Sequence, residues 1–379
     1  TLISAALIVI FFIPYTASGF AACGKLFNSL LGFDYHAAMI VSAVVIVLYC
    51  TMGGFLAAST SDLVQSIIMT FALAVVVIFG IVQAGGMGVV LDNAKALPGY
   101  LDMFHTHIAE TNSSGDYGFF KIVSTLAWGL GYFGMPHILV RFMSIKKSSM
   151  IKKSATIAIV WVILSLGSAI ALAILGRMIL GGELLPSGAQ DTVFIVFVRR
   201  LFPSFIAGLL MSAIIAASMS TADSQLLVAS SSFTSDIYKP LIRKKASDKE
   251  LLWVGRLVVL IVAVVAYFIA SSKAQGAQAI MDLVENAWAG FGSAFGPVVI
   301  LSVFWKRITY KGAVAGVVGG AVVDVLWLAF LSSPTGIYEL LPGFVAGLLC
   351  CIVGSLLDHK PSAEVLAVYE RATAEQDED

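Results

Sequence analysis

Charged residues are scarce in this sequence. Only 12% of its 379 residues are Asp, Glu, Lys or Arg, and the two signs balance to a formal net charge of zero. Soluble domains carry roughly 25% charged residues, so the shortage argues against an ordinary soluble domain. A net charge of zero gives no indication for or against an acidic partner. We expect no nucleic-acid partner.

Cysteine is also rare, and the chain shows no recognisable catalytic motif. The four cysteines lie in apolar runs without the spacing of metal ligands, so we interpret them as small packing residues. We therefore expect no enzymatic activity and no cofactor. The first basic residue is Lys25, which leaves no charged start for a signal peptide. The chain begins without Met inside an apolar run, which predicts that further N-terminal sequence precedes it.

Apolar residues make up 59% of the sequence and are gathered in long runs. Runs of roughly 20 apolar residues indicate membrane-spanning helices. The sequence therefore predicts an all-α polytopic membrane protein, with a transmembrane domain over residues 1–358 and an acidic, disordered tail over 359–379. Ten spans are predicted, at 2–30, 36–56, 61–85, 118–143, 154–180, 203–232, 251–272, 279–304, 311–332 and 337–357.

Basic residues orient these spans because they collect on the cytoplasmic side of a membrane. They cluster in alternate connections, at 141–153, 239–249 and 306–311. This pattern predicts that the start of the first span and the C-terminus both lie in the cytoplasm.

Small and hydroxyl residues interrupt the apolar run at 217–224, Ala-Ser-Met-Ser-Thr-Ala-Asp-Ser. On a helix, Ala217, Ser220, Thr221 and Ser224 share one face. Their hydroxyl and carbonyl oxygens are the ligands that a small hard cation prefers, and Asp223 adds a carboxylate at membrane depth, where carboxylates are costly and usually functional. The alternative is close helix packing, with the hydroxyls bonded back to carbonyls.

The fourth predicted span is expected to be broken. Between Trp128 and His137 it contains three Gly and one Pro, which weaken a continuous helix. Discontinuous helices near the middle of the membrane form the solute sites of many transporters. Trp128, Tyr132 and Pro136 follow one another at four-residue spacing and would line one side of the break. The alternative is an ordinary kinked helix. The similar stretch from Trp288 to Pro297 predicts a kink or gate.

Several motifs together resemble the sodium/solute symporter family. They include Gly53-Gly54-Phe-Leu-Ala-Ala, Asp62-Leu-Val-Gln, the segment 128–137 followed by Arg141-Phe, and the Ser220-Thr221 helix ending Ser235-Asp-Ile-Tyr-Lys239. The likeness covers nearly all of residues 1–360 and is greatest to bacterial sodium/proline symporters. It implies the LeuT-type inverted-repeat fold, in which the ten spans correspond to core helices three to ten plus two peripheral helices. Core helix one, which supplies part of the sodium and solute sites in the family, would precede the chain.

The resemblance also implies roles for individual residues. It places a sodium site at the carbonyl of Ala217 and the hydroxyls of Ser220 and Thr221. It places the solute against four residues, namely Tyr15, Trp128, Tyr132 and Pro136.

The resemblance further suggests a second cation site. Asp62 matches an acidic position that helps to bind a second sodium in some members. Asp223 stands where small hydroxyl residues are usual. Together with Ser224, these carboxylates would either hold a second sodium or share a proton, because two close carboxylates cannot both ionise without a cation between them. In the alternative, Asp223 only caps or bonds a neighbouring helix.

The expected function is sodium-coupled import of a small amino acid, with proline as the expected solute, by alternating access across a bacterial inner membrane. Met135 stands where proline symporters commonly have Gln, so a symporter for pantothenate, another amino acid or a sugar acid stays open. A transporter-like membrane sensor module or an inactive fragment would also be compatible with the sequence.

Overall fold

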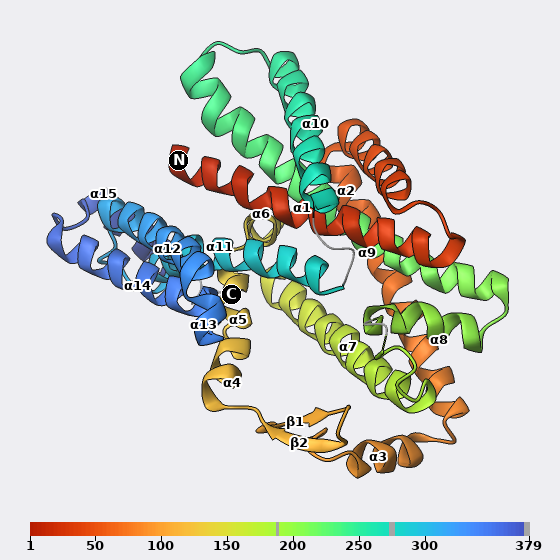
Figure 1. The fold of residues 1–379 in the computed structure, drawn as a ribbon. Helices are drawn as coiled ribbons and strands as arrows, with labels where there is room; N and C mark the ends of the chain where they lie inside the picture. The colour runs from red at the N-terminus through yellow and green to blue at the C-terminus, as the bar shows by residue number, and fades with distance from the viewer. Residues whose placement is uncertain (187–188, 273–276, 375–379) are drawn as a thin grey trace. The chain divides into compact units, whose positions relative to one another are not determined.

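The computed structural model of the protein describes residues 1–186, 189–272 and 277–374 and is almost wholly helical (Figure 1). Its first elements are α1 (Leu2–Leu31), α2 (Tyr35–Gln83), α3 (Met87–Ala96), β1 (His105–Ile108) and β2 (Ser113–Asp116). Short elements follow, namely α4 (Phe119–Leu126), α5 (Trp128–Gly131), η1 (Tyr132–Gly134) and α6 (Pro136–Met143). The others are α7 (Met150–Ile179), η2 (Gln190–Thr192), α8 (Val193–Leu201), α9 (Ser204–Ser232), η3 (Phe233–Ile242), α10 (Asp248–Ser272), α11 (Ala277–Phe304), α12 (Tyr310–Phe330), α13 (Ser332–Thr335), α14 (Leu340–Leu357) and α15 (Ala363–Ala374).

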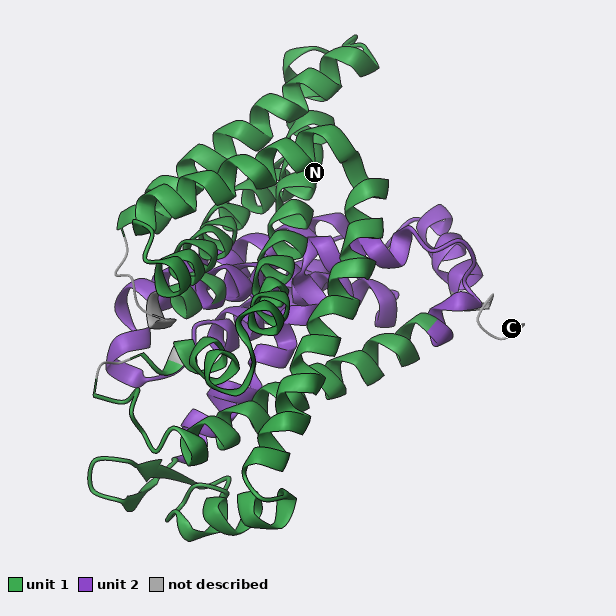
Figure 2. Cartoon of the chain, turned by 90° about the vertical axis from the view of Figure 1, so that its right-hand side faces the viewer, with its two compact units in different colours: residues 1–117, 154–284 green, residues 118–153, 285–379 purple. Residues whose placement is uncertain are grey.

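The chain divides into two compact units, coloured separately in Figure 2. The first unit comprises residues 1–117 and 154–284, and the second comprises residues 118–153 and 285–379. Each is described by itself.

Eight helices of the described chain are long and apolar enough to cross a membrane, where the sequence predicted ten separate spans. One reason for the difference is α2, which has 49 residues and a non-helical glycine, Gly54, with φ 61° and ψ −169°. At about 1.5 Å per residue, α2 extends roughly 70 Å, about twice the hydrocarbon thickness of a bilayer. The two arms of α2 on either side of Gly54 therefore account for the predicted spans 36–56 and 61–85.

Contacts around Gly54 satisfy backbone groups close to this bend. The hydroxyl of Tyr49 donates to the carbonyl of Ala57 across the bend, at 3.4 Å. The Nε of Arg256 on α10 donates to the carbonyl of Thr51, at 3.2 Å. Irregular backbone is tolerated at membrane depth where protein groups meet its hydrogen-bonding needs, and these two side chains do so here.

The fourth predicted span is the second reason for the lower number. It is divided among α4, α5, η1 and α6, so the predicted break is confirmed. Pro136 is the first residue of α6, and Met135 before it has the extended conformation, with φ −78° and ψ 109°. A residue before proline avoids helical backbone, which explains why the helix ends there.

The stretch Trp288–Pro297, where the sequence predicts a kink or gate, lies within one helix of the described chain, α11, and Pro297 is inside that helix. Pro297 cannot bond the carbonyl of Ser293 one turn earlier. Gly320 and Gly347 approach that carbonyl so closely that neither position has room for a Cβ. The neighbouring helices α12 and α14 thus pack against α11 at the point where the backbone hydrogen bond to Ser293 is missing.

In the first unit, α1, α2, α9 and α10 pack around an apolar core. The core includes Phe20, Met39, Leu226 and Val262. Gly19 of α1 lies against α9, where a Cβ would meet Ser218 and Ala222 at 3.7 Å. Small residues let membrane helices approach closely, because lipid provides no hydrophobic force between them.

The connection 86–117, between the third and fourth predicted spans, contains α3 and the antiparallel hairpin β1–β2, seen at the bottom of Figure 1. In this hairpin region, Asp102 accepts bonds from the backbone N–H of Phe104 at 2.8 Å and from His105 Nδ1 at 2.9 Å. These bonds stabilise the carboxylate and hold the pKa of Asp102 below its ordinary value. His105 and His107 serve loop contacts, since His107 Nδ1 bonds the carbonyl of Pro98 at 3.0 Å.

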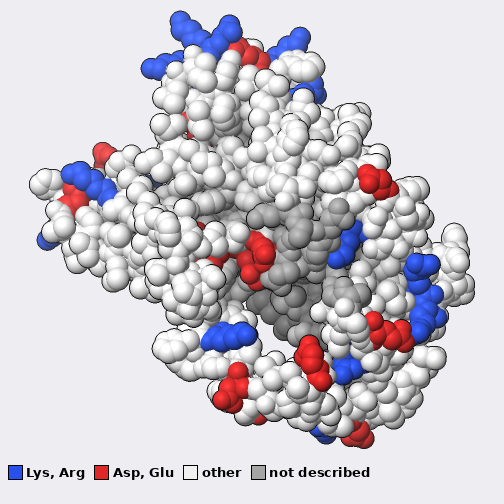
Figure 3. Space-filling model, viewed as in Figure 1, with Lys and Arg blue, Asp and Glu red and all other residues white. Residues whose placement is uncertain are grey.

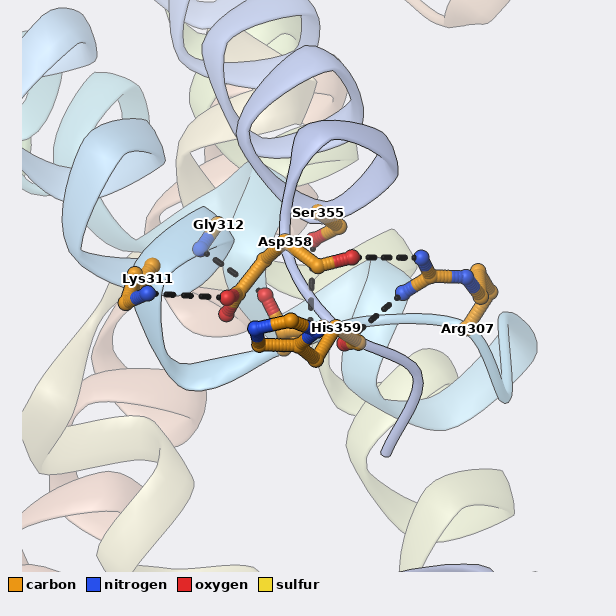
Figure 4. Close-up of polar contacts among 7 residues, drawn as sticks. Arg307, Lys311, Gly312, Ser355, Asp358 and His359 are labelled. Carbon is orange, nitrogen blue, oxygen red and sulfur yellow. Dashed lines mark hydrogen bonds and ion pairs between the residues drawn. The ribbon is translucent and has the colours of Figure 1, made fainter. Parts of the chain in front are cut away.

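Glycines also bring α12 and α14 of the second unit together. Gly312, Gly316 and Gly320 repeat every four residues on α12, and a Cβ at Gly312 or Gly316 would collide with Cys351 or Ser355 of α14. At the end of this pair, Arg307 donates to the carbonyls of Asp358 and His359, at 2.9 and 3.4 Å (Figure 4). Both carbonyls lie just beyond the end of α14, so Arg307 fixes the backbone where the chain leaves this helix.

A second cation reaches the same end of α14. Lys311 Nζ lies 3.0 Å from the carboxylate of Asp358 and holds the pKa of that carboxyl below its ordinary value (Figure 4).

The tail was expected to be disordered, but its residues 363–374 form α15. The hydroxyl of Ser362 accepts from the N–H of Val365 at 3.4 Å, as a helix N-cap does. The last acidic residues, 375–379, lie outside the described residues.

Candidate functional site

The three predicted sodium ligands lie together on α9 within the first unit. The carbonyl oxygen of Ala217 accepts from Ser220 Oγ at 3.1 Å and from Thr221 Oγ1 at 3.0 Å. All three residues are half-buried. Both hydroxyls are therefore bonded back to a backbone carbonyl, which is the arrangement expected if these residues serve only close helix packing. The same two bonds also bring three oxygen atoms together at one point of the helix. Three clustered neutral oxygens are a partial ligand set for a small hard cation.

The two carboxylates of the predicted second cation site also belong to this unit. Asp223 is fully buried on α9, and its Oδ1 accepts from the hydroxyl of Ser224 at 3.2 Å. Asp62 lies on the second arm of α2, which packs along α9. Both carboxylates act electrostatically on Tyr49 and Cys50 of the first arm. Asp62 therefore lies on a helix that packs against the helix carrying Asp223 and Ser224.

Two buried polar side chains in the same helices were missed by the sequence analysis. Thr16 of α1 and Gln225 of α9 are fully buried. Among the described residues, no hydrogen-bond partner reaches the hydroxyl of Thr16 or either amide atom of Gln225. Gln225 follows Thr221 by one turn and so shares its face. Burying the amide of a glutamine in an apolar run costs free energy, as burying the hydroxyls of this helix does. The position of Gln225 in such a run was therefore the sequence feature that could have indicated it.

The second unit holds the broken helix and three of the predicted solute residues. Trp128 begins α5, Tyr132 begins η1, and Pro136 begins α6, so they fall on three consecutive short elements. Trp128 is half-buried, Tyr132 is exposed and Pro136 is buried. Met135, between them, is completely buried. Tyr15, the fourth predicted solute residue, is buried on α1 of the first unit.

Glycines of the broken helix permit its close approach to α11 in the second unit. A Cβ on Gly131 would collide with the indole of Trp288, and a Cβ on Gly134 with the carbonyl of Phe291. Gly129, the third glycine, faces open space. Two of the three glycines are therefore required by packing, which explains their concentration at the break.

Comparison with known proteins identifies the family of this chain. A family model described as the sodium:solute symporter family matches residues 1–320. The chain belongs to this family. The symporter is 42% identical over 377 residues to a sodium/proline symporter of Escherichia coli (strain K12), covering 98% of this chain and 72% of that relative. It is 41% identical over 374 residues to a sodium/proline symporter of Staphylococcus aureus, covering 96% and 70%.

A solved structure shares the fold of the symporter. It is a Na+-coupled sialic acid symporter in a substrate-bound outward-open state, described as revealing a novel Na+-site. The TM-score is 0.70 at 18% identity, over 95% of this chain and 75% of the other. Family membership makes the symporter a multi-pass membrane transporter with sodium as its coupling ion, and not an enzyme.

Proposed function

We propose that the symporter imports a small amino acid, with proline as its first candidate, together with sodium. The observation that carries this is the group of oxygens from Ala217, Ser220 and Thr221 on α9. They match the positions that the family resemblance assigns to sodium. The relatives named sodium/proline symporters extend over almost the whole chain, which favours proline over other solutes.

Within the second unit, the solute would contact Trp128, Tyr132 and Pro136 on the broken helix. The family resemblance also assigns a solute contact to Tyr15, which lies on α1 of the first unit. The backbone groups of the break and the aromatic side chains suit a small amphipathic solute, since the former recognise polar groups and the latter exclude water from the apolar part. Sodium binding would favour the outward-facing state, so that sodium and solute each raise the affinity for the other.

A second cation or a proton would be held by Asp62, Asp223 and Ser224. Asp223 is fully buried, and an ionised carboxylate at that position needs a positive charge nearby. Two sodium ions per solute would follow from the first arrangement, and a pH-dependent cycle with one sodium from the second.

The finer architecture is also part of this proposal. The predicted spans would correspond to core helices three to ten of the LeuT-type fold, with α12 and α14 peripheral. The protein would lie in the bacterial inner membrane, with its C-terminus in the cytoplasm. Lys and Arg gather over the connection between η3 and α10, at the top of Figure 3, which supports a cytoplasmic position for that connection.

The test is uptake of labelled solutes by the full-length protein, including any sequence that precedes residue 1, in liposomes with and without an inward sodium gradient. The panel contains proline, other amino acids, pantothenate and sialic acid, and we expect proline uptake to depend on the gradient. Equal proline uptake in both conditions would refute sodium coupling, and sodium-driven uptake of another solute alone would refute the choice of proline.

A further inference from the structure

Trp128 stacks against two aromatic side chains that the sequence analysis did not connect with it. Its ring centroid lies 5.5 Å from that of Trp288 on α11, with 20° between the planes. It lies 6.0 Å from the ring of Tyr338, just before α14, with 19° between the planes. Tyr132 meets Trp288 edge-on, with centroids 4.8 Å apart. We call Trp128, Tyr132, Trp288 and Tyr338 the aromatic cluster; all four belong to the second unit.

Hydrogen bonds hold Trp288 and Tyr338, the two rings that stack on Trp128, in place. Trp288 Nε1 donates to the carbonyl of Trp128 at 2.9 Å, so one side chain both stacks on Trp128 and bonds its backbone beside the break. Tyr338 is held at two points. Its N–H donates to Ser124 Oγ of α4 at 2.6 Å, and its hydroxyl donates to the carbonyl of Glu285 on α11 at 2.8 Å.

These contacts give Trp128 an orientation that the broken helix alone does not provide. An indole on a short helical segment can adopt several rotamers, whereas parallel stacking on two anchored rings selects one. The anchors come from three different elements, namely α4, α11 and the segment before α14. Tyr338 is thus bonded through its backbone to α4, which precedes the break, and through its hydroxyl to α11.

We propose that Tyr338 is a positioning residue that acts through Trp128 and thereby sets the affinity and selectivity for the solute. This inference rests on the proposed function, in which Trp128 contacts the solute. Tyr338 itself does not need to touch the solute. A preorganised side chain loses less conformational freedom when the solute binds, so a loosened Trp128 binds more weakly and discriminates less.

The first experiment compares Tyr338→Leu, which removes the stacked ring, with Tyr338→Phe, which keeps the ring and removes only the hydroxyl. Trp327→Phe is the matched control, because Trp327 Nε1 bonds the carbonyl of the neighbouring Ile337, at 3.1 Å, and so supports the same segment through a different contact. For Tyr338→Leu we expect an approximately tenfold higher half-saturation for proline, a smaller preference for proline over other amino acids, and an unchanged sodium half-saturation at saturating proline. Tyr338→Phe and Trp327→Phe should stay within about twofold of the wild type.

A double-mutant cycle tests whether the effect passes through Trp128. In a Trp128→Phe background, Tyr338→Leu should add less than about twofold to the half-saturation. If it adds the full tenfold, Tyr338 acts independently of Trp128 and the proposal is overturned. The proposal is equally overturned if Tyr338→Leu behaves like Trp327→Phe.

A spectroscopic measurement separates this inference from the proposed function. Two stacked indoles couple their transitions, so the circular dichroism of the purified symporter should contain a Trp128–Trp288 signal that Trp128→Phe removes. Tyr338→Leu should reduce this signal without any solute present, and an unchanged signal would refute the positioning role even if no proline transport were observed. If Tyr338→Leu does not fold, Ser124→Ala releases the backbone of Tyr338 while keeping all four aromatic side chains in the sequence. It should reduce the signal in the same direction, and an unaltered signal would again refute the role.

Discussion

Ser220 and Thr221 donate to the same carbonyl, that of Ala217. A sodium ion bound there would take the lone pairs of both hydroxyls and of the carbonyl together, so each hydroxyl should contribute separately to its affinity. Ser220→Ala and Thr221→Ala remove these oxygens and keep a good helix former. We expect each to raise the sodium concentration for half-maximal uptake about tenfold, on the order of 1.4 kcal/mol.

The matched control is Ser212→Ala on the same helix. Its hydroxyl bonds the carbonyl of Leu209, at 2.6 Å, away from the proposed ligands. Uptake assayed over a range of sodium concentrations checks the prediction. A wild-type sodium requirement in both Ser220→Ala and Thr221→Ala would place the ion elsewhere.

Asp223 is the residue that separates the two models of the second site. Asp223→Ser removes the charge and leaves a small hydroxyl, the residue type that the family resemblance implies for this position. With a second sodium, the Hill coefficient for sodium should fall from about two to about one. With a proton, the pH dependence of uptake should flatten. A variant with the wild-type Hill coefficient and pH profile would leave Asp223 a purely structural role.

The broken helix provides the prediction at the scale of elements. In Gly134→Ala, the new methyl group would collide with the backbone carbonyl of Phe291, which cannot turn aside as a side chain can. Forcing an extra carbon into a packed region costs about 1–3 kcal/mol. We therefore expect a lower melting temperature in detergent and reduced uptake. Gly129→Ala is the control, since its Cβ meets nothing within 4 Å; equal stability of the two variants would contradict the prediction.

The end of α14 should respond to acid. The pKa of Asp358 is lowered by Lys311, so their interaction stabilises the folded state at pH values above the ordinary Asp pKa of about 3.9. That contribution is lost as the pH falls through the lowered folded-state pKa. In Lys311→Met, the decrease in melting temperature between neutral and strongly acidic pH should be smaller than in the wild type. An unchanged decrease would show that this pair has no measurable part in acid sensitivity.

Elements that follow from local pattern could be predicted from the sequence, and those that depend on distant contacts could not. Hydropathy placed α1, α7, α9, α10, α12 and α14 to within a few residues. It could not show that Gly54 joins two spans in one bent helix, nor that Gly320 and Gly347 pack against the carbonyl of Ser293, one turn before Pro297. At the candidate site, the one-face spacing predicted the cluster of Ala217, Ser220 and Thr221. The stacking of Tyr338 on Trp128 depends on residues 210 positions apart, which no local pattern records.

Orientation is a property of the whole molecule. The basic connection between η3 and α10 should lie in the cytoplasm, and the β1–β2 hairpin on the other side. We would replace the native cysteines by alanine and introduce Ser247→Cys or Ser114→Cys separately. A membrane-impermeant maleimide added outside intact cells should label Ser114→Cys and leave Ser247→Cys unmodified until the membrane is opened. The reverse pattern would invert the proposed topology.

The aromatic cluster has a consequence for synthesis of the protein in the cell. Trp128 leaves the ribosome long before Trp288 and Tyr338, which lie 160 and 210 residues later. At about 5–20 residues per second, that interval is roughly 10–40 s. During this time the break at Met135 and Pro136 is in or near the membrane without the side chains that later anchor it. A ribosome that stalls before Tyr338 is made would therefore leave an inserted protein whose defect lies some 200 residues upstream of the missing segment.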